Sequence, residues 1–358
     1  MEDVYTRLAE KLNQLPNGFP PTESGVELKI LQKIFTPDEA EMAMRIRPIP
    51  EAVEAIAQRL GKSVEEMQAI LDNMVEKGQI GTAKAGDQQV YLLFPFVLGI
   101  YEFQLNRMDR ELAELFEEYA PTLLTVLGTF KPGFFRVIPV NQQIKAQHEV
   151  KPYEDVRRMV ERSRSFQVSD CICRKEQALM GNPCSHPLET CLSFSRTEGA
   201  FDKHPSGRII SKEEALEVIA KAEEDGLIHQ TYNVQSGHMF VCNCCSCCCG
   251  VLRGLKEYAA PYMVAGSNFV AAIDQETCEA CGLCATERCP VGAIAAENDV
   301  YTVRPDRCIG CGVCTTACPT ESITLIRKPE ALRDEPPNNI MEWYFKRAAE
   351  RGIKIMID

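Results

Sequence analysis

The sequence predicts a multidomain protein of the α+β class, and three observations support this prediction. The chain has 358 residues, enough for two or three domains that each bury a core of their own. Between residues 26 and 76, apolar side chains recur with the period of a helix, whereas the runs that follow are short and strand-like. All 18 cysteines lie at or beyond Cys171, so the chemical character of the chain changes between its two halves.

A helical domain that ends in a hairpin is expected over residues 1–100. Apolar faces predict four helices, over residues 4–15, 28–35, 53–60 and 64–75. Ser63 followed by Glu66 has the pattern of a capping box, which begins the last of these helices. Two strand-like runs, 79–83 and 88–94, flank an Ala-Gly-Asp turn and can form a hairpin. Three helices followed by a hairpin resemble a winged helix-turn-helix.

Beyond residue 100 the chain divides into four further segments: a helical connector (101–165), a cysteine-rich metal-binding domain of α/β character (166–265), a pair of repeated cysteine motifs (266–328) and a tail with a helix (329–358). In the cysteine-rich domain, a helix opened by Ser211 is expected over residues 212–225 and a strand over 227–234. The amphipathic run Met341–Arg351 predicts the last helix.

Charge and hydropathy exclude several classes of partner. The chain has 51 acidic and 39 basic residues, a formal charge of -12, which disfavours nucleic acid as a partner because phosphate is bound mainly by Lys and Arg. The most apolar stretch, Tyr91–Phe103, is interrupted by Pro95 and Glu102, so no membrane span is expected. The N-terminus does not resemble a signal peptide, which predicts a cytoplasmic protein with reduced thiols. Dense thiols in a reducing compartment indicate metal binding.

Two cysteine runs in the segment 266–328 repeat, at an offset of 30 residues through their first three cysteines. They are Cys278, Cys281, Cys284 and Cys289-Pro290, followed by Cys308, Cys311, Cys314 and Cys318-Pro319. Three cysteines at spacings of three let one loop direct three thiolates to one cluster, while the fourth, before proline, turns toward a neighbouring cluster. Gly282 and Gly312 permit backbone conformations and close contacts that a Cβ would obstruct.

This segment resembles a bacterial-type ferredoxin with two 4Fe-4S clusters. The resemblance implies a βαββαβ fold in which the remote cysteine of each motif completes the cluster of the other. It assigns Cys278, Cys281, Cys284 and Cys318 to one cluster, and Cys308, Cys311, Cys314 and Cys289 to the second. The first motif departs from the simplest pattern, because four residues rather than three precede its Cys-Pro. The alternative is that the sites bind zinc, or that the clusters serve only as structural staples.

Ten further cysteines lie in the central domain, in two groups: Cys171, Cys173, Cys184 and Cys191, then Cys242, Cys244, Cys245, Cys247, Cys248 and Cys249. Ten ligands exceed one four-coordinate site, so one cluster with spare thiols, two sites or a larger cluster are all open. Adjacent cysteines point in different directions, so Cys244 can share a metal with Cys247, or Cys245 with Cys248. We expect a third iron-sulfur centre whose ligands come from Cys171, Cys173, Cys184, Cys191, Cys245 and Cys248. Zinc is the alternative, with His186 or His204 as a nitrogen ligand.

These observations predict an iron-sulfur electron-transfer protein or subunit, more an electron-transfer component of an oxidoreductase complex than an enzyme by itself. It would pass single electrons between its clusters and a redox protein partner in anaerobic metabolism, and it could form homo-oligomers. One alternative is a reductase subunit with a catalytic central cluster. Another is a cluster-sensing winged-helix regulator, but residues 26–95 contain 11 acidic and 8 basic residues, and the third helix carries Glu65, Asp72 and Glu76 where a DNA reader needs cations.

Overall fold

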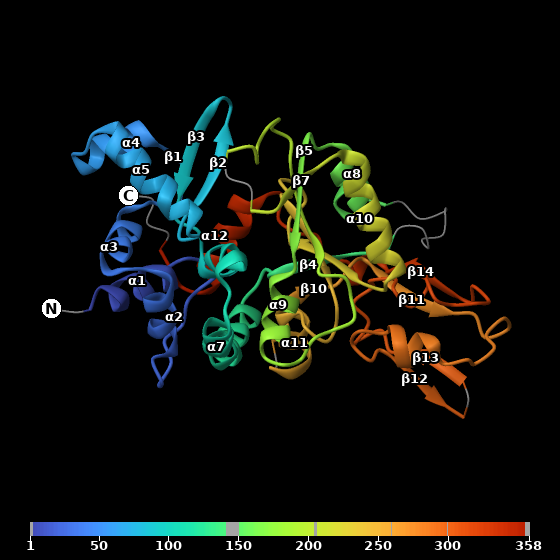
Figure 1. The fold of residues 1–358 in the computed structure, drawn as a ribbon. Helices are drawn as coiled ribbons and strands as arrows, with labels where there is room; N and C mark the ends of the chain where they lie inside the picture. Colours follow the sequence, from blue (N-terminus) through green and yellow to red (C-terminus); the bar gives the residue numbers. More distant parts are fainter. Residues whose placement is uncertain (1–2, 141–149, 204–205, 259, 299, 355–358) are drawn as a thin grey trace.

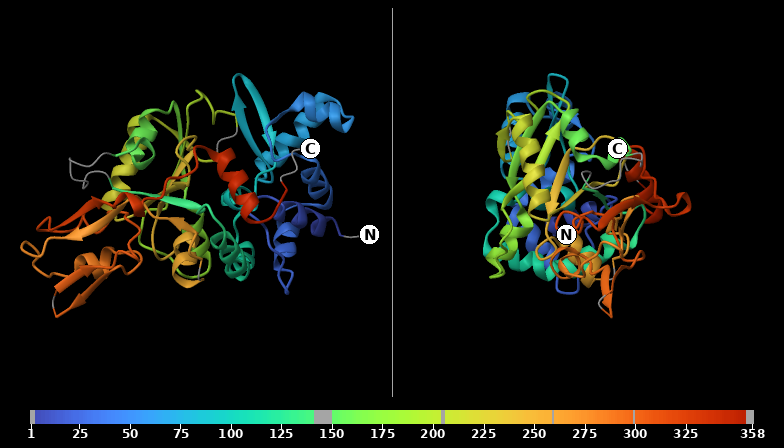
Figure 2. Two further views of the ribbon diagram at one scale, coloured as in Figure 1. Left: turned by 180° about the vertical axis from the view of Figure 1, so that it is seen from behind. Right: turned by 90° about the vertical axis from the view of Figure 1, so that its right-hand side faces the viewer.

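The structure, a computed structural model, describes residues 3–140, 150–203, 206–258, 260–298 and 300–354. It has a mixed α+β fold, as the sequence predicts, with four sheets in this part of the chain. The molecule is elongated: the N-terminal helices lie at one end, the largest sheet in the middle and the repeated cysteine motifs at the other end (Figure 1). The parts follow one another in space as they do in the sequence, except that the last helix returns toward the N-terminal end (Figure 2).

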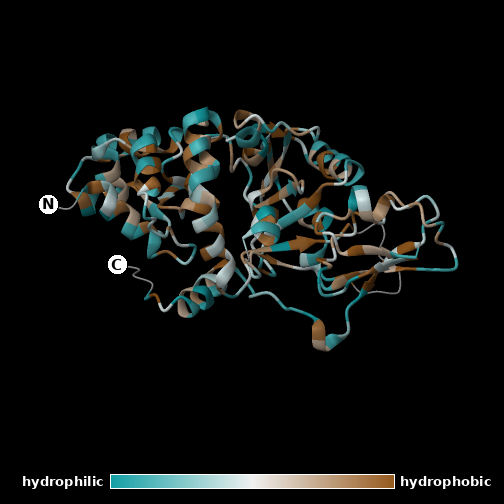
Figure 3. Cartoon of the chain, turned by 90° about the horizontal axis from the view of Figure 1, so that it is seen from below, coloured by the Kyte–Doolittle hydropathy of each residue, from teal (hydrophilic) through white to brown (hydrophobic). Residues whose placement is uncertain are grey.

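The N-terminal part combines helices with a small antiparallel sheet of order β1-β3-β2. Its elements are α1 (Val4–Asn13), α2 (Val26–Ile34), α3 (Pro37–Arg45), β1 (Glu51–Ala52), α4 (Val53–Leu60), α5 (Val64–Glu76), β2 (Gly81–Ala85) and β3 (Gln88–Leu92). The helices carry hydrophobic residues on one side and hydrophilic residues on the other (Figure 3), and their apolar sides share one core. Four of the helices and the hairpin therefore lie close to where the periodicity predicts them.

Helix α3 is an element that the sequence analysis does not anticipate, although its start carries a clear signal. Thr36 is the N-cap and Pro37 is the first helical residue. The Glu39 carboxylate accepts a hydrogen bond of 2.9 Å from the Thr36 amide, and Thr36 Oγ1 accepts one from the Glu39 amide, which completes a capping box. At α5 the capping is simpler than predicted. Ser63 Oγ accepts a hydrogen bond from the amide of Glu66 at 3.1 Å, but the Glu66 carboxylate pairs with a lysine instead.

The segment expected as a helical connector also contributes a strand to the central sheet. Its elements are α6 (Tyr101–Phe103), η2 (Leu105–Arg107), α7 (Arg110–Thr129), β4 (Phe135–Ile138), η4 (Pro152–Glu154) and α8 (Val156–Glu161). All four residues of β4 are buried, because the strand pairs on both sides, with β8 and β10. A fully buried strand of four residues has no alternation that would distinguish it from part of a helix.

The central sheet has seven strands in the order β10-β4-β8-β9-β6-β5-β7. The remaining elements of this region are β5 (Ser165–Asp170), α9 (Ile172–Leu179), β6 (Glu189–Ser195), β7 (Arg208–Ile210), α10 (Lys212–Glu224), β8 (Ile228–Tyr232), β9 (Phe240–Cys244), α11 (Gly250–Glu257) and β10 (Val264–Ala265). Leu192 and Val241 point to one face of the sheet, where α8 and α10 pack. Cys191 and Cys242 are each offset by one residue from these and point to the opposite face.

The C-terminal region contains two antiparallel strand pairs: β11 (Phe269–Ile273) with β14 (Ile323–Arg327), and β12 (Ile294–Glu297) with β13 (Val300–Val303). The helix expected between β11 and β12 is reduced to one turn, η5 (Cys284–Arg288). The chain then returns through η6 (Glu330–Leu332) to α12 (Ile340–Glu350). No helix of the described residues is long and apolar enough to cross a membrane.

Helix α12 packs against the N-terminal part and the end of α7 through buried side chains. Trp343 is fully buried and its Nε1–H donates a hydrogen bond to the carbonyl of Gly133 at 3.0 Å. Arg347 is also fully buried, and its guanidinium donates to the carbonyls of Pro16 at 3.1 Å and Phe130 at 2.9 Å. One side chain thus joins the loop after α1 to the end of α7.

Candidate metal centres

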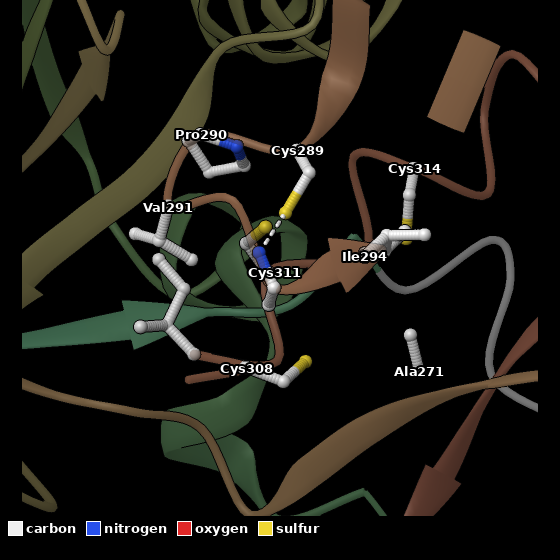
Figure 4. Close-up of a pocket in the computed structure, with 11 residues that line it drawn as sticks. Ala271, Cys289, Pro290, Val291, Ile294, Cys308, Cys311 and Cys314 are labelled. Atoms are coloured by element: carbon white, nitrogen blue, oxygen red, sulfur yellow. Dashed lines mark hydrogen bonds between the residues drawn. The ribbon is translucent and has the colours of Figure 1, made fainter. Parts of the chain in front are cut away.

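Two cavities lie between the repeated cysteine motifs, each with a volume of about 320 Å³, part of which is open to solvent. The inner cavity is lined by Cys289, Cys308, Cys311 and Cys314, with Ala271 and Ile294 beside them (Figure 4). The outer cavity is lined by Cys278, Cys281, Cys284 and Cys318. The amide of Ala293 donates a hydrogen bond to Cys289 Sγ at 3.0 Å at the inner cavity (Figure 4). Each cavity therefore takes three cysteines from one motif and one from the other.

This mixing follows from the strand pairing. Ile273 of β11 pairs with Ile323 of β14, so Cys278, five residues after the first, and Cys318, five residues before the second, reach the same end of the pair. The register of β12 and β13, in which Ile294 faces Val303, brings Cys289 and Cys308 together in the same way. Four thiols around one cavity are a donor set that fits a 4Fe-4S cluster.

A glycine at the same place in each motif lets the loop pass close to a neighbour. Gly282 and Gly312 have φ angles of 79° and 80°, in the left-handed region that glycine enters most easily. A Cβ on Gly312 would lie 2.8 Å from Leu325 Cδ1, and a Cβ on Gly282 would lie 2.7 Å from Tyr301 Oη. Both glycines are thus required by conformation and by space.

The two cavities differ in their exposure to solvent. Cys281 of the outer cavity is exposed, whereas Cys311 and Cys314 of the inner cavity are buried. The loop of the second motif is held against the rest of the protein by the Val140 amide, which donates to the carbonyl of Cys311 at 3.0 Å. Burial raises the pKa of the Cys311 thiol to about 12, so a bound cation is needed to keep this sulfur as a thiolate at neutral pH.

The ten central cysteines separate into two groups. The four-sulfur group comprises Cys184, Cys245, Cys247 and Cys248, whose Sγ atoms all lie within 4.8 Å of one another. The six-thiol group comprises Cys171, Cys173, Cys191, Cys242, Cys244 and Cys249. Each thiol of this group interacts electrostatically with the next in the order Cys171, Cys173, Cys249, Cys244, Cys242 and Cys191. The structure therefore contains two central groups of sulfur ligands where the sequence analysis expects one centre.

Arg174 lies between these two groups and is 2 % exposed. Its guanidinium donates to the carbonyls of Pro187 at 2.8 Å and Asn243 at 2.9 Å. It interacts electrostatically with Cys171 of the six-thiol group and with Cys245 of the four-sulfur group. Its Nε is one of the buried polar atoms of the described residues without a hydrogen-bond partner in the protein. One buried cation is therefore available to sulfur ligands of both groups.

Buried acids border the six-thiol group on the side of α6. Burial, with a smaller contribution from the nearby Cys242, raises the pKa of Glu102 to about 8. Burial also raises the pKa of Glu176 to about 9, with a contribution from Glu117. Both carboxyls are thus protonated at neutral pH, as expected for acids in an apolar region close to anionic sulfur.

The sequence-predicted central ligands divide between the two groups. Cys184, Cys245 and Cys248 come together, as the predicted sharing of a metal by Cys245 and Cys248 requires, and Cys171, Cys173 and Cys191 belong to the six-thiol group. The predicted set omits four cysteines that the structure includes, Cys247 in the first group and Cys242, Cys244 and Cys249 in the second. Cys242 and Cys244 share a face because β9 is a strand, a signal available once that strand is recognised. His186 pairs with Asp225 at 2.5 Å, and His204 lies outside the described residues.

The surface of α5 faces the protein's own central region. The Tyr91 hydroxyl donates a hydrogen bond of 2.6 Å to the carboxylate of Asp72 on α5. Lys203 Nζ lies 3.4 Å from the same carboxylate. Lys84 of β2 donates to the carbonyl of Glu198 at 3.2 Å. The segment between Glu198 and Lys203 therefore contacts both α5 and the hairpin.

Residues 301–324 match the model of the family described as the 4Fe-4S binding domain. The match includes Cys308, Cys311, Cys314 and Cys318, the whole second motif. No curated protein and no solved structure matches the chain. The chain therefore contains a 4Fe-4S binding domain near its C-terminal end, together with a cluster of cysteines in its central region.

Proposed function

We propose that this chain, in which residues 301–324 match a 4Fe-4S binding domain, is an electron-transfer protein with two 4Fe-4S clusters that exchanges single electrons with a redox protein partner. The observation that supports the proposal most directly is the pair of cavities, each lined by four cysteines. The inner set would be Cys289, Cys308, Cys311 and Cys314, and the outer set Cys278, Cys281, Cys284 and Cys318. A bound 4Fe-4S cluster supplies the one-electron chemistry.

The difference in burial suggests a direction for the exchange. Cys281 is exposed, so a partner that docks over it approaches the outer set most closely. The inner set adjoins the central region: a Cβ on Gly226 would lie 3.5 Å from Val313, and the next residue, Leu227, belongs to the core of Cys245 and Cys248. The outer set would therefore face the partner, and the inner set would face the central metal sites.

The four-sulfur group would bind one tetrahedral ion, zinc or iron. Sulfur atoms bound at about 2.3 Å to a single ion are about 3.8 Å apart, which agrees with four atoms that all lie within 4.8 Å of one another. A cubane cluster separates its thiolates further, because each binds a different iron. This replaces a third cubane at these residues with a mononuclear thiolate centre.

The N-terminal part would serve as a winged-helix-like adaptor for protein contacts. The sheet order β1-β3-β2 behind three helices agrees with that architecture. In a DNA reader, the helix before the hairpin enters the major groove and approaches phosphate. Here Asp72 on that helix and Lys84 on the hairpin contact the segment 198–203 instead. These contacts favour the electron carrier over the regulator.

Metal analysis and low-temperature EPR of the anaerobically purified full chain test this proposal. The two cavity sets require about eight irons and about eight sulfides per chain, and the reduced protein should give spin-coupled signals from two neighbouring clusters. A protein with about four irons or fewer and stoichiometric zinc at the repeated motifs would refute it.

A further inference from the structure

The six-thiol group is built on two neighbouring strands and two helix N-termini. Because Leu192 of β6 pairs with Val241 of β9, Cys191 lies opposite Cys242 on the adjoining strand. Cys244 is two residues further along β9, so its side chain shares the face of Cys242. Three of the six sulfurs are thus fixed by the register of the central sheet.

Helices supply the other three sulfurs. Cys171 is the N-cap of α9, with Cys173 in the first turn, and Cys249 is the N-cap of α11; both helices have eight residues. Cys171 and Cys249 thus lie at the positive ends of the α9 and α11 helix dipoles. Amide donors and the positive end of a helix dipole stabilise negative charge on sulfur. The group is therefore arranged to hold thiolates.

The sulfurs of the six-thiol group are spread more widely than the ligands of one ion. In the described residues, the one set of three or more His, Cys, Asp or Glu ligand atoms that all lie within 4.8 Å of one another is the four-sulfur group. The thiols of the six-thiol group interact electrostatically in series instead, and Cys171 at one end also acts on Cys191 at the other.

We propose that the six-thiol group is a separate metal site that binds a polynuclear iron-sulfur cluster of more than four irons through all six cysteines. A cubane offers one outward position on each of four irons, so six thiolates around one cluster require additional irons. Six neighbouring thiolates, of which Cys244 and Cys249 are buried, also require compensating positive charge, and Arg174 supplies a single cation. Each thiol that binds iron releases its proton to solvent. The site does not depend on the function proposed for the two cavities.

Iron, zinc and acid-labile sulfide in the anaerobically purified full chain, with Mössbauer spectra of protein enriched in ⁵⁷Fe, test the proposal. Two cubanes, together with the mononuclear ion if it is iron, account for at most about nine irons, so the wild-type chain should exceed nine irons by more than four. Each of the six cysteines should be changed to serine in turn. Every variant should lose the same iron component, while the EPR signals of the two cavity clusters persist and show that the chain is folded.

Two matched variants complete the design. Ser193→Ala lies two residues from Cys191 on the same face of β6 and should leave the iron content unchanged. Cys247→Ser, in the four-sulfur group, should remove one ion and no more. Full iron in any two of the six serine variants would indicate a cubane with spare thiols and overturn the proposal. Loss of zinc without sulfide, or a wild-type chain with about nine irons, would overturn it as well. Absence of the cavity EPR signals alone would instead contradict the proposed function.

Discussion

The carbonyl oxygen of Asn243, between Cys242 and Cys244, accepts a hydrogen bond of 2.9 Å from Nη2 of Arg174. Arg174 follows Cys173 directly, so this bond ties the first turn of α9 to the strand that carries two other cysteines. The same guanidinium donates to Thr190 Oγ1 at 2.6 Å, next to Cys191. One arginine thus orients three segments that present sulfur to the six-thiol group.

Arg174→Met should remove this connection and reduce metal binding at both central groups. Three acceptors would lose their donor and the buried thiolates their cation, which together should cost about 3–5 kcal/mol of stability. Iron and zinc analysis with thermal unfolding measures both effects. Arg174→Lys keeps the charge but loses the planar fork, so it should restore the metal content only in part. The exposed Arg110→Gln is the control; equal metal content in Arg174→Met and wild type would contradict the role.

Cys284→Ala and Cys318→Ala should damage the same cluster, although the two residues belong to different motifs. Both line the outer cavity, whereas Cys289 lines the inner one. EPR of the reduced variants should show loss of one common signal, with about four irons lost in each. Cys289→Ala should remove the other signal. If Cys284→Ala and Cys289→Ala, which belong to one motif, lost the same signal instead, the crossed ligation would be wrong.

Gly312→Ala should disturb the inner cluster by two separable effects. A residue with a Cβ at this φ costs about 1–2 kcal/mol, and the new methyl group would also lie 2.8 Å from Leu325. Gly86→Ala isolates the first effect, because Gly86 has a φ of 62° and no neighbour within 4 Å of a Cβ. Gly312→Ala should therefore lower the melting temperature more than Gly86→Ala does, and it alone should weaken the EPR signal of the inner cluster. Equal effects would show that space at Gly312 is unimportant.

Duplex DNA should bind weakly and without sequence preference at physiological salt. The helix that would enter the groove presents Asp72, and its neighbouring hairpin is occupied by the segment 198–203. Gel-shift titrations of oxidised and reduced protein against a randomised duplex pool measure this directly. Enrichment of one DNA sequence, in either redox state, would instead support the hypothesis that the protein is a transcription regulator.

Arg347→Met should destabilise the contact between the N-terminal part and α7. Its guanidinium is fully buried and donates to carbonyls from the loop after α1 and the end of α7, so its loss leaves buried acceptors unpaired at a cost of roughly 2–4 kcal/mol. Proteolysis between residues 1 and 100 should accelerate relative to wild type. Lys346→Gln, at an exposed neighbour, should not change the rate.

Elements that are determined by neighbouring residues can be predicted from the sequence. Elements and sites that are determined by contacts between distant residues cannot. Ser211 caps α10 where the sequence places it, because a side-chain oxygen and an apolar period suffice. Strand β4 is not predicted, because all four of its residues are buried and its sequence therefore lacks the alternation of apolar and polar residues that marks a half-exposed strand. The eight cysteines of the repeated motifs line the two cavities in the sets that the resemblance assigns to the two clusters. The central cysteines cannot be assigned to their two groups from the sequence. The register of β6 against β9 places Cys191 beside Cys242, 51 positions later in the chain, and this pairing of distant strands has no local signal.

The buried anchor of α12 has a consequence for the order in which the polypeptide is completed during translation. Arg347 and Arg351 contact residues 13–16, and Arg347 lies 331 positions after Pro16, so these contacts form long after residues 13–16 are synthesised. Cys318 precedes both arginines, and all other cysteines precede Cys318. Every cysteine of the sequence has therefore been synthesised before α12 can contact residues 13–16. Metal can therefore reach these cysteines before α12 contacts residues 13–16.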